Sequence, residues 1–569
     1  MTYYHPISVR EAVEKVNETW FLPAIQRPYD WGERDKKEKF IYKLFDSIVR
    51  EYPIGTLIVW ETRKKIPYRP FLRDYESEKL EKIVDKGHWG KKGVLLIYDG
   101  QQRLQSLYSC LNFTFHNKVL CYNLLFDLNT DKRANGFKFF VKQGDPEEGY
   151  IRLNEVYSWN PKKQVEFEES MLETLRKSKK SLNKKEERVA KGNLKQLWKL
   201  FIDRDFKLLS SFPLERDMTQ EEVVDIFTRI NTTGMALTGL EILFSKVKTV
   251  QCDFEERIWE ANLDIKRQTN GFQFGPDDTL QVLHSLVKDT VRVDPERVDS
   301  SELEKFVQAW RELNSPLKSF FYDFLYRDFR MTHEKTITNK RALFPLIVYF
   351  YYMRKLNKKK FQHFSKSKKS MIDMKRYLLY SQLLYWDLQG YIDNFCRIIK
   401  NGCEKAKGYD FPFRRLRNFV EDSGRRQTHF RADDFDDPYQ RWFVLKMITP
   451  NKPFTFLSDP DERFNPEIDH IFPMTPNFRI SNPKRYNKWV DTIWNLQPVK
   501  GEVNAIKLAS SPKDFFTEHP EYLKDYDFLP TKDLNDDLWL PENADKFIQA
   551  RKIRIIAWIK HNYHVDIKL

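Results

Sequence analysis

The order of hydrophobic patterns along the chain most strongly constrains its fold. The first 150 residues contain apolar runs of strand length, which predict strands at residues 56–60, 94–98, 119–128 and 137–141. A short helix is predicted over 11–17, and apolar residues at helical spacing predict further helices over 40–49, before these runs, and over 104–111, between them. From about residue 165 the pattern is helical and highly charged. We therefore expect an α+β protein with an N-terminal α/β domain, a helical middle region and a further C-terminal domain.

Chain length sets the number of domains. At about 150 residues per domain, 569 residues predict three or four cores. A stretch rich in Asp and Pro at 431–466 marks the start of a separate C-terminal domain. We predict domains at 1–250, 251–430 and 431–569, with the middle region serving as scaffold and DNA-binding surface. The longest apolar run, 342–353, has 12 residues, whereas a membrane span needs about 20, so we expect a buried helix and no membrane partner.

Charge and cysteine content indicate the compartment and the kind of partner. Lys and Arg number 97 against 82 Asp and Glu, an excess of +15 that favours a polyanion such as nucleic acid over a merely basic protein. Basic runs lie at 176–207, 353–376 and 414–426. One such run is usually a solvated helix face, but three with nearby aromatic residues favour a nucleic-acid contact. Five cysteines without a C-x-x-C pair, and no signal pattern at the N-terminus, predict a cytoplasmic protein with reduced thiols.

The C-terminal region carries the sharpest chemical signal. The segment Glu467-Ile468-Asp469-His470-Ile471-Phe472-Pro473 is followed, after 24 residues beyond His470, by Asn495-Leu496-Gln497 and then by Asn504-Ala505-Ile506-Lys507. Histidine titrates near neutral pH and suits a base that activates water. Carboxylate and amide oxygens, here of Asp469 and Asn504, suit Mg²⁺. Because adjacent strand residues point to opposite faces, Asp469 and His470 can converge only if the strand ends or bends there.

These residues resemble the HNH, or ββα-metal, nucleases. The resemblance implies that His470 is the general base, that Asp469 and Asn504 bind the metal, that Asn495 pins the loop and that Lys507 contacts phosphate. Two departures are Asn504 in place of the final His, and Trp494 where many relatives have Gly. The cysteine pairs that bind structural zinc in some HNH proteins are absent. The alternative is a structural histidine in a loop.

Three further clusters lie in the N-terminal region. They are Pro23-Ala24-Ile25-Gln26-Arg27-Pro28-Tyr29-Asp30-Trp31, Tyr98-Asp99-Gly100-Gln101-Gln102-Arg103-Leu104 and Phe227-Thr228-Arg229-Ile230-Asn231-Thr232-Thr233-Gly234. The second cluster follows a predicted strand and begins a helix, whose N-terminus attracts anions. Gly100 lets the backbone approach a ligand closely, Arg103 offers a phosphate fork, and Asp99 suits a helix cap or a metal. A phosphate pocket and a plain capped helix remain about equally supported by spacing alone. No Walker A motif is present.

The three clusters resemble the ParB/sulfiredoxin-like domain of GmrS-type proteins over residues 5–250. The following HNH-like segment resembles the GmrD-type partner, so the fused chain resembles a GmrSD-type, type IV-like, modification-dependent restriction nuclease. The resemblance implies that the N-terminal domain binds and hydrolyses a nucleoside triphosphate and gates the nuclease. The residues carried over to the nucleotide site are Gln26, Arg27, Tyr29, Asp99, Gly100, Gln101, Gln102, Arg103, Arg229 and Asn231.

These predictions combine into one expected function. We expect a nucleotide-regulated endonuclease that depends on Mg²⁺ or another divalent metal and cuts double-stranded, modified phage DNA in prokaryotic defence. Two alternatives stay open: a DNA-binding regulator with a degenerate HNH module, and an abortive-infection toxin acting on RNA or host DNA. A homo-oligomer is also compatible with the sequence.

Overall fold

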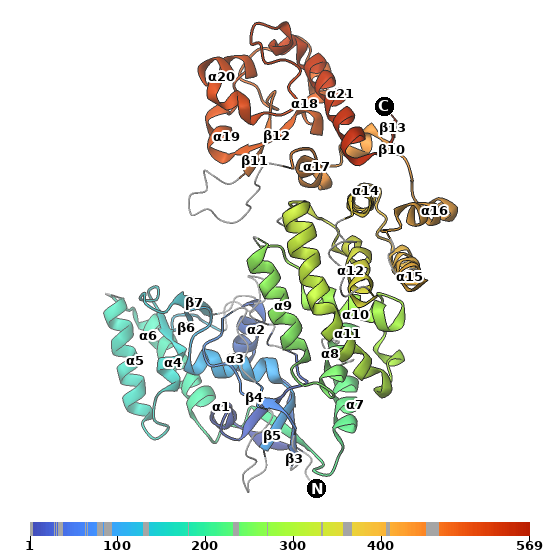
Figure 1. Ribbon diagram of the computed structural model, residues 1–569. Coiled ribbons are helices and arrows are strands. Elements are labelled where there is room, and N and C mark those ends of the chain that lie inside the picture. The colour runs from blue at the N-terminus through green and yellow to red at the C-terminus, as the bar shows by residue number, and fades with distance from the viewer. Residues whose placement is uncertain are drawn as a thin grey trace. The chain divides into compact units, whose positions relative to one another are not determined.

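The chain divides into two compact units in a computed structural model. The structure describes residues 4–27, 29, 31, 38–62, 64, 66–76, 83–84, 94–128, 136–179, 181–231, 238–269, 271–331, 334–356, 367–405, 410–450 and 466–568. The units are Met1–Glu256 and Arg257–Leu569, drawn in Figure 1 from blue to red along the chain. The predicted boundary at residue 430 lies inside the second unit, so a separate domain over 431–569 stays a prediction.

A six-stranded mixed sheet forms the centre of the first unit. Its spatial order is β1-β9-β3-β5-β2-β4, in which β3 runs parallel to β9 and antiparallel to β5. The strands are β1 (His5–Ile7), β2 (Trp20–Pro23), β3 (Thr56–Thr62), β4 (Tyr68–Arg69), β5 (Val94–Asp99) and β9 (Leu209–Leu214). The strands predicted at 56–60 and 94–98 are confirmed as β3 and β5, which lie side by side near the middle of the sheet.

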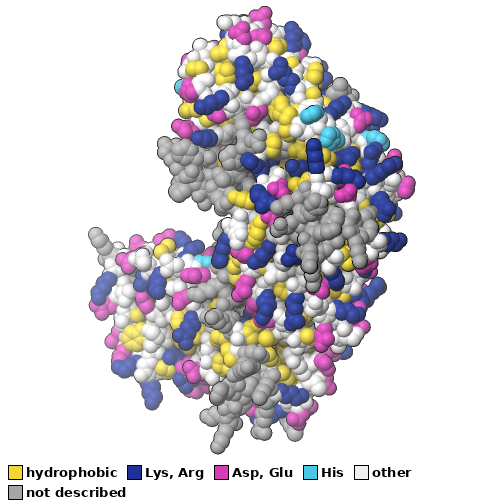
Figure 2. All heavy atoms as spheres, in the orientation of Figure 1, with side chains coloured by type: hydrophobic (Ala, Val, Ile, Leu, Met, Phe, Trp, Pro, Cys, Tyr) yellow, Lys and Arg dark blue, Asp and Glu magenta, His cyan; other side chains and the backbone are white. Residues whose placement is uncertain are grey.

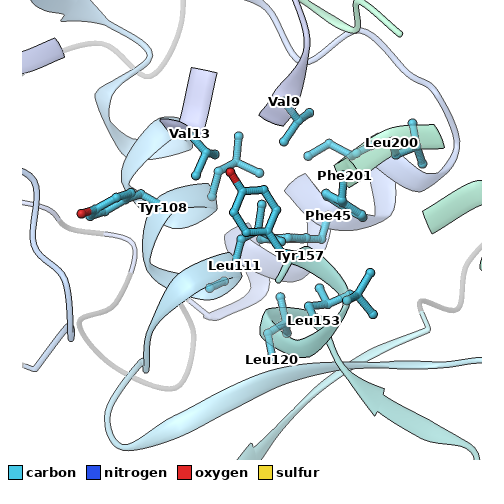
Figure 3. Close-up of a cluster of buried hydrophobic side chains, with 14 of the residues drawn as sticks. Val9, Val13, Phe45, Tyr108, Leu111, Leu120, Leu153, Tyr157, Leu200 and Phe201 are labelled. Atoms are coloured by element: carbon cyan, nitrogen blue, oxygen red, sulfur yellow. The ribbon is translucent and has the colours of Figure 1, made fainter. Parts of the chain in front are cut away.

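Helices pack their apolar sides into one core beside this sheet. These are α1 (Val9–Lys15), α2 (Glu38–Val49) and α3 (Gln101–Asn112). Figure 3 shows side chains from α1, α2 and α3, including Val13, Phe45 and Leu111, meeting Leu153 and Phe201 from later segments. The helix predicted at 11–17 begins earlier, at Val9, because Ser8 caps it and Glu11 completes a capping box.

A smaller antiparallel sheet and further helices complete the first unit. Its order is β7-β6-β8, and the two strands predicted at 119–128 and 137–141 are found as β6 and β7. The elements are β6 (Lys118–Asn123), β7 (Phe137–Val141), β8 (Tyr150–Arg152), α4 (Leu153–Tyr157), α5 (Gln164–Ser178), α6 (Lys184–Leu197), α7 (Gln220–Asn231) and α8 (Gly239–Lys248). Helices α5 and α6 lie side by side in Figure 1.

The second unit is largely helical. Its longer helices are α9 (Phe254–Gln268, which begins at the end of the first unit), α10 (Pro276–Lys288), α11 (Ser300–Ser319), α12 (Phe344–Leu356), α14 (Lys368–Leu383), α15 (Gln389–Lys405), α16 (Phe413–Ser423) and α21 (Ala544–Tyr563). The predicted buried helix over 342–353 is found as α12, whose residues 344–353 are all buried. None of the described helices is long and apolar enough to cross a membrane. None of the five cysteines, all of which lie in the described residues, forms a disulfide bond.

Short strands and helices near the C-terminus hold the nuclease-like motif. Strand β11 (Pro466–His470) pairs antiparallel with β12 (Leu496–Lys500), and α19 (Gly501–Lys507) follows β12 directly. Other strands and α-helices of this region are β10 (Phe430–Arg431), α17 (Arg441–Ile448), α18 (Pro483–Val490), α20 (Pro512–Glu518) and β13 (Ile567–Lys568). The chain thus combines an N-terminal mixed sheet with a mainly helical remainder, which confirms the α+β class. Its ParB/sulfiredoxin-like and HNH assignments stay predictions.

Candidate functional site

The predicted nuclease residues gather around the β11–β12 pair and α19. Asp469 lies opposite Gln497 and His470 lies opposite Leu496, so β11 ends at the Asp-His pair. Asn504 and Lys507 are one helical turn apart on α19, and Glu467 and Asp469 share one face of β11. The two faces meet: Asn504 Nδ2 donates to Glu467 Oε2 at 2.6 Å, and Lys507 Nζ donates to Asp469 Oδ1 at 3.0 Å.

Asp469 is buried, and both of its carboxylate oxygens accept hydrogen bonds. Oδ1 accepts from Lys507, and Oδ2 accepts from the Tyr526 hydroxyl at 2.7 Å. Lys507 also donates to the His470 carbonyl oxygen at 2.6 Å and is fully buried. Burial raises the pKa of Asp469, and the Lys507 ammonium opposes that shift. Here Lys507 therefore holds a positive charge against Asp469 and does not face solvent.

His470 points to a different partner from Asp469, as expected for neighbours on a strand. Its Nε2 lies 3.1 Å from Asp491 Oδ1, and about a fifth of the imidazole side chain is exposed. Arg441 pairs with the same carboxylate at 3.0 Å. Nearby, Asp436 accepts from the Ile493 backbone N–H at 2.6 Å, and burial raises the pKa of Asp436 to about 6. His470 is more exposed than Asp469, which is buried.

Asn495 is buried and bonded entirely to backbone. Its Nδ2 donates to the carbonyls of Phe472 and Val490 at 2.8 and 2.7 Å, and its Oδ1 accepts from the Phe472 N–H at 3.1 Å. Arg551 of α21 supports the adjoining strand, because its guanidinium donates to the carbonyls of Trp494 and Leu496 at 2.6 and 3.0 Å. These bonds fix the loop after His470 against the start of β12. Trp494 itself is buried.

The β11–α19 interface offers oxygen donors of the kind that Mg²⁺ prefers. Glu467 and Asp469 supply carboxylates and Asn504 an amide oxygen, all from one interface. Among the described residues there is no group of three or more His, Cys, Asp or Glu side chains able to hold a metal. Mg²⁺ keeps several waters and takes few protein ligands, so this mixed oxygen set fits it better than a transition metal.

The three N-terminal motifs come together in the first unit. Ile25, Tyr98 and Phe227, one from each motif, belong to a single buried cluster, and the rings of Tyr98 and Phe227 are 6.5 Å apart. Gln26 Nε2 donates to the Tyr98 carbonyl at 2.7 Å. Tyr29 reaches α3, where its hydroxyl bonds Ser106 Oγ at 2.7 Å. The first motif is thus attached to the end of β5 and to the following helix.

Basic side chains donate hydrogen bonds to the backbone of the turn that contains Gln26. Arg69 donates to the carbonyls of Gln26 and Arg27 at 2.9 and 2.8 Å, and Lys248 donates to the Gln26 carbonyl at 2.8 Å. Both cations are buried beside Glu255 and Glu256. Gln26 Oε1 is buried and has no hydrogen-bond partner within the described part of the chain. A buried amide oxygen of this kind is a group that a bound ligand could satisfy.

Gly100 and Arg103 have a clear structural role. Gly100 caps α3 with φ +86°, and a Cβ there would lie 2.3 Å from Leu57 Cδ2. The Arg103 guanidinium donates to the Ile54 carbonyl, to the Thr56 carbonyl at 3.1 Å and to Asp99 at 3.0 Å. Arg103 therefore ties the end of β5 to the start of β3.

The three arginines predicted to belong to the nucleotide site already pair with carboxylates. Arg27 pairs with Glu241 at 2.5 Å, and Arg103 pairs with Asp99. Arg229 is largely exposed and pairs with Asp225 at 2.8 Å. Gln101 and Gln102 are buried in the first turn of α3. The side chain of Asn231, and residues Pro28, Asp30 and 232–234 of the motifs, lie outside the described residues.

Several neighbours of these sites carried no signal in the sequence. Asp491, Tyr526 and Arg551 reach the nuclease motif from separate segments, and Arg69 and Lys248 reach the Gln26 turn in the same way. Glu467 stands within the predicted segment, and its pairing with Asn504 depends on how α19 packs.

Together, the mixed sheet, the gathered motifs and the helical remainder define an α+β protein with two compact units. Residues 9–248 match the family described as the GmrSD restriction endonuclease, N-terminal domain, so this part of the chain is similar to such a domain. Over 243 residues the chain is 27% identical to an uncharacterized protein of Methanocaldococcus jannaschii, covering 40% of this chain and 38% of that protein.

Proposed function

We propose that this protein is a divalent-metal-dependent DNA endonuclease of restriction type, regulated by a nucleoside triphosphate and directed at modified phage DNA. The observation that carries the proposal is the arrangement at β11, where His470, paired with Asp491, directly follows Asp469 along the strand, and the oxygen donors Asp469 and Asn504 lie in the β11–α19 interface. The family match of residues 9–248 supports the restriction-type role and DNA as the substrate. The strand–strand–helix order of the motif supports an HNH-type nuclease.

His470 is the proposed general base. An ionised carboxylate only accepts hydrogen bonds, so the contact with Asp491 places the imidazole proton on Nε2. Nδ1 then carries the lone pair that takes a proton from the attacking water. Arg441 and the backbone bonds of Asn495 keep Asp491 and the following loop in position.

Asp469 and Asn504 are the proposed metal ligands, with Glu467 as a third oxygen donor. A bound divalent cation would hold an oxygen of the scissile phosphate and stabilise charge on the leaving oxygen. Lys507 competes for Asp469, because its ammonium already lies 3.0 Å from Oδ1. Phosphate contact by Lys507, the role implied by the family resemblance, would require it to leave both Asp469 and the His470 carbonyl oxygen.

The first unit is the proposed triphosphate-binding regulator. The N-terminus of α3, where Gly100 provides no side-chain cap hydrogen bond, and the unpartnered Gln26 Oε1 support a polar ligand near the meeting point of the motifs. Phosphate binding by Arg27, Arg103 or Arg229 would require each to leave its present carboxylate.

Substitution of His470 tests the nuclease. His470→Ala is expected to lower the rate of DNA cleavage in Mg²⁺ by roughly 10²- to 10⁴-fold, because a general base contributes that much. Asp491→Asn is expected to cost roughly 10- to 100-fold through misplacement of the imidazole. Single-turnover cleavage of modified and unmodified phage DNA provides the measurement.

His519 provides a matched control, since it lies beside Glu521 in the same unit. His519→Ala should cleave at the wild-type rate and unfold at the wild-type temperature. Equal cleavage by wild type and His470→Ala would rule out His470 as the base.

Asp99 tests the triphosphate site. Asp99→Ala is expected to abolish triphosphate hydrolysis and any nucleotide-dependent change in cleavage, since it removes the only carboxylate of the second motif. The control is Asp46→Ala, which breaks an equivalent ion pair with Arg50 on α2. Unchanged hydrolysis by Asp99→Ala, or an equal loss in both variants, would place the hydrolytic site elsewhere.

A DNA-binding regulator is the second candidate. The observation that favours it is the engagement of both Asp469 oxygens by Lys507 and Tyr526, which leaves a less open metal site. This candidate predicts tight DNA binding without cleavage over a range of divalent metals.

A further inference from the structure

A basic groove of about 800 Å³ lies in the second unit, away from the Asp-His motif in sequence. It is formed by α14, α16 and the residue that ends α21, His564. Figure 2 shows dark blue and cyan side chains gathered on this face. Two acidic residues, Asp373 and Glu421, face five basic ones: Lys368, Lys369, Arg376, Arg414 and Arg417. The lining thus carries a clear excess of positive charge.

A cation–π contact, an ion pair and a strand pairing hold the lining of this groove in place. The guanidinium of Arg376 lies over the ring of Phe413 at 4.5 Å and pairs with Asp373 at 3.2 Å. His564 has φ +50° and ends α21, and the chain then forms β13, which pairs in parallel with β10. The C-terminal segment is therefore tied to the strand that follows α16, which keeps His564 beside the groove.

Two cations of the groove, Lys368 and Arg414, are available to bind an anionic ligand. Lys369 is bound to Asp410 at 3.0 Å, and Arg417 donates to His429 at 3.0 Å. Lys368 and Arg414 are exposed, and no ion pair to either is found among the residues that the structure describes. Exposed cations at an open groove bind a polyanion through its phosphates.

We infer that this groove binds the backbone phosphates of duplex DNA. The choice of DNA rests on the proposed nuclease function, whereas the affinity for a phosphate polymer rests on the groove itself. No base-specific contact is required, since phosphate contacts position a nucleic acid without reading its sequence.

One helix connects the groove to the nuclease motif. Arg551 of α21 bonds the start of β12, and His564 ends the same helix at the groove. At about 1.5 Å per residue these two positions are about 20 Å apart along the helix, or about six base pairs of duplex. DNA held in the groove is thereby kept within reach of the strand pair that carries His470.

Binding by the full chain in EDTA tests the groove without cleavage. The double variant Lys368→Glu, Arg414→Glu is compared with Lys305→Glu, Arg311→Glu, which places the same charge change on the exposed side of α11. The probe is a fluorescein-labelled 30-base-pair DNA duplex, followed by anisotropy over a salt series. We expect the affinity of the groove variant for DNA to fall about tenfold. In a plot of log K against the logarithm of salt concentration, the magnitude of its slope should fall by about two. The control variant should keep an affinity and a slope near those of wild type.

The outcomes separate the groove from the nuclease. The proposal that the groove binds DNA would be overturned if the groove variant kept wild-type affinity, or if both variants lost the same affinity. Either result would count whether or not the wild-type protein cleaves DNA in Mg²⁺. Tighter binding of an RNA duplex of the same sequence would overturn the choice of DNA. If the groove variant alone loses binding and wild type fails to cleave, the groove stands and the proposed nuclease function falls.

Discussion

Lys507 and Asp469 form an ion pair that is shielded from solvent. Removal of one partner of a buried pair leaves an uncompensated charge, which costs far more than the pair contributes. Lys507→Met should therefore lower the free energy of unfolding by about 3–5 kcal/mol in EDTA. Urea unfolding measures this cost.

Metal should offset part of that loss if Asp469 is a ligand, because a divalent cation would replace the missing ammonium. The control is Lys484→Met on exposed α18, expected to change stability by less than about 0.5 kcal/mol. An equal, small cost for both variants would show that the Asp469 carboxylate does not depend on Lys507. No effect of Mg²⁺ on Lys507→Met would count against Asp469 as a ligand.

Motif spacing predicted some side chains that do meet, but their partners could not be predicted. Asp469, Asn504 and Lys507 lie in one interface because residues three apart on a helix and two apart on a strand share faces. Tyr526 and Asp491 reach the same motif from segments whose placement depends on tertiary packing. The present engagement of Lys507 with Asp469 also differs from the phosphate contact that the family resemblance implied.

Gly55, just before β3, and Gly100, between β5 and α3, both lie against the side chain of Arg103. Gly55 has φ +86°, and a Cβ there would lie 2.3 Å from Arg103 Nη1. Gly55→Ala should therefore lower the free energy of unfolding by about 1–3 kcal/mol, because it combines a left-handed backbone with displacement of Arg103. Thermal or urea unfolding gives the measurement.

Gly192 of α6 is the matched control, since a Cβ there meets nothing within 4 Å. Gly192→Ala in a helix interior should raise stability by up to about 1 kcal/mol. A neutral Gly55→Ala variant would contradict the close packing of Arg103 against this turn.

Strands and helices with compact or periodic apolar patterns were predictable from the sequence. Strand β9 was not, because it forms through pairing with strands that are distant in sequence. Strands β3 and β5 and helices α2, α3 and α12 each present a buried face that the sequence already displays. Strand β9 was missed, because its residues LSSFPL form no continuous apolar run and follow a long helical stretch. Its pairing with β1 and β3 is set by long-range contacts.

Under these proposals, different segments of the chain carry the three roles. The first unit regulates, the groove of α14 and α16 binds DNA, and the residues near β11 cleave it. The net charge of +15 indicated a polyanionic partner without locating its site. The structure concentrates basic side chains in the groove of α14 and α16, while the proposed chemistry depends on a few residues near β11. Net charge could not distinguish these two positions, because it does not record how helices converge.

Chemical rescue of the His470→Ala variant tests the nuclease proposal most directly. The variant has space for a free base near the proposed water site, so added imidazole should restore part of the Mg²⁺-dependent cleavage of DNA, and the restored rate should rise with the concentration of neutral imidazole. His519→Ala should cleave normally and gain nothing from imidazole. Cleavage by His470→Ala at the wild-type rate without imidazole would contradict the assignment of His470 as the base.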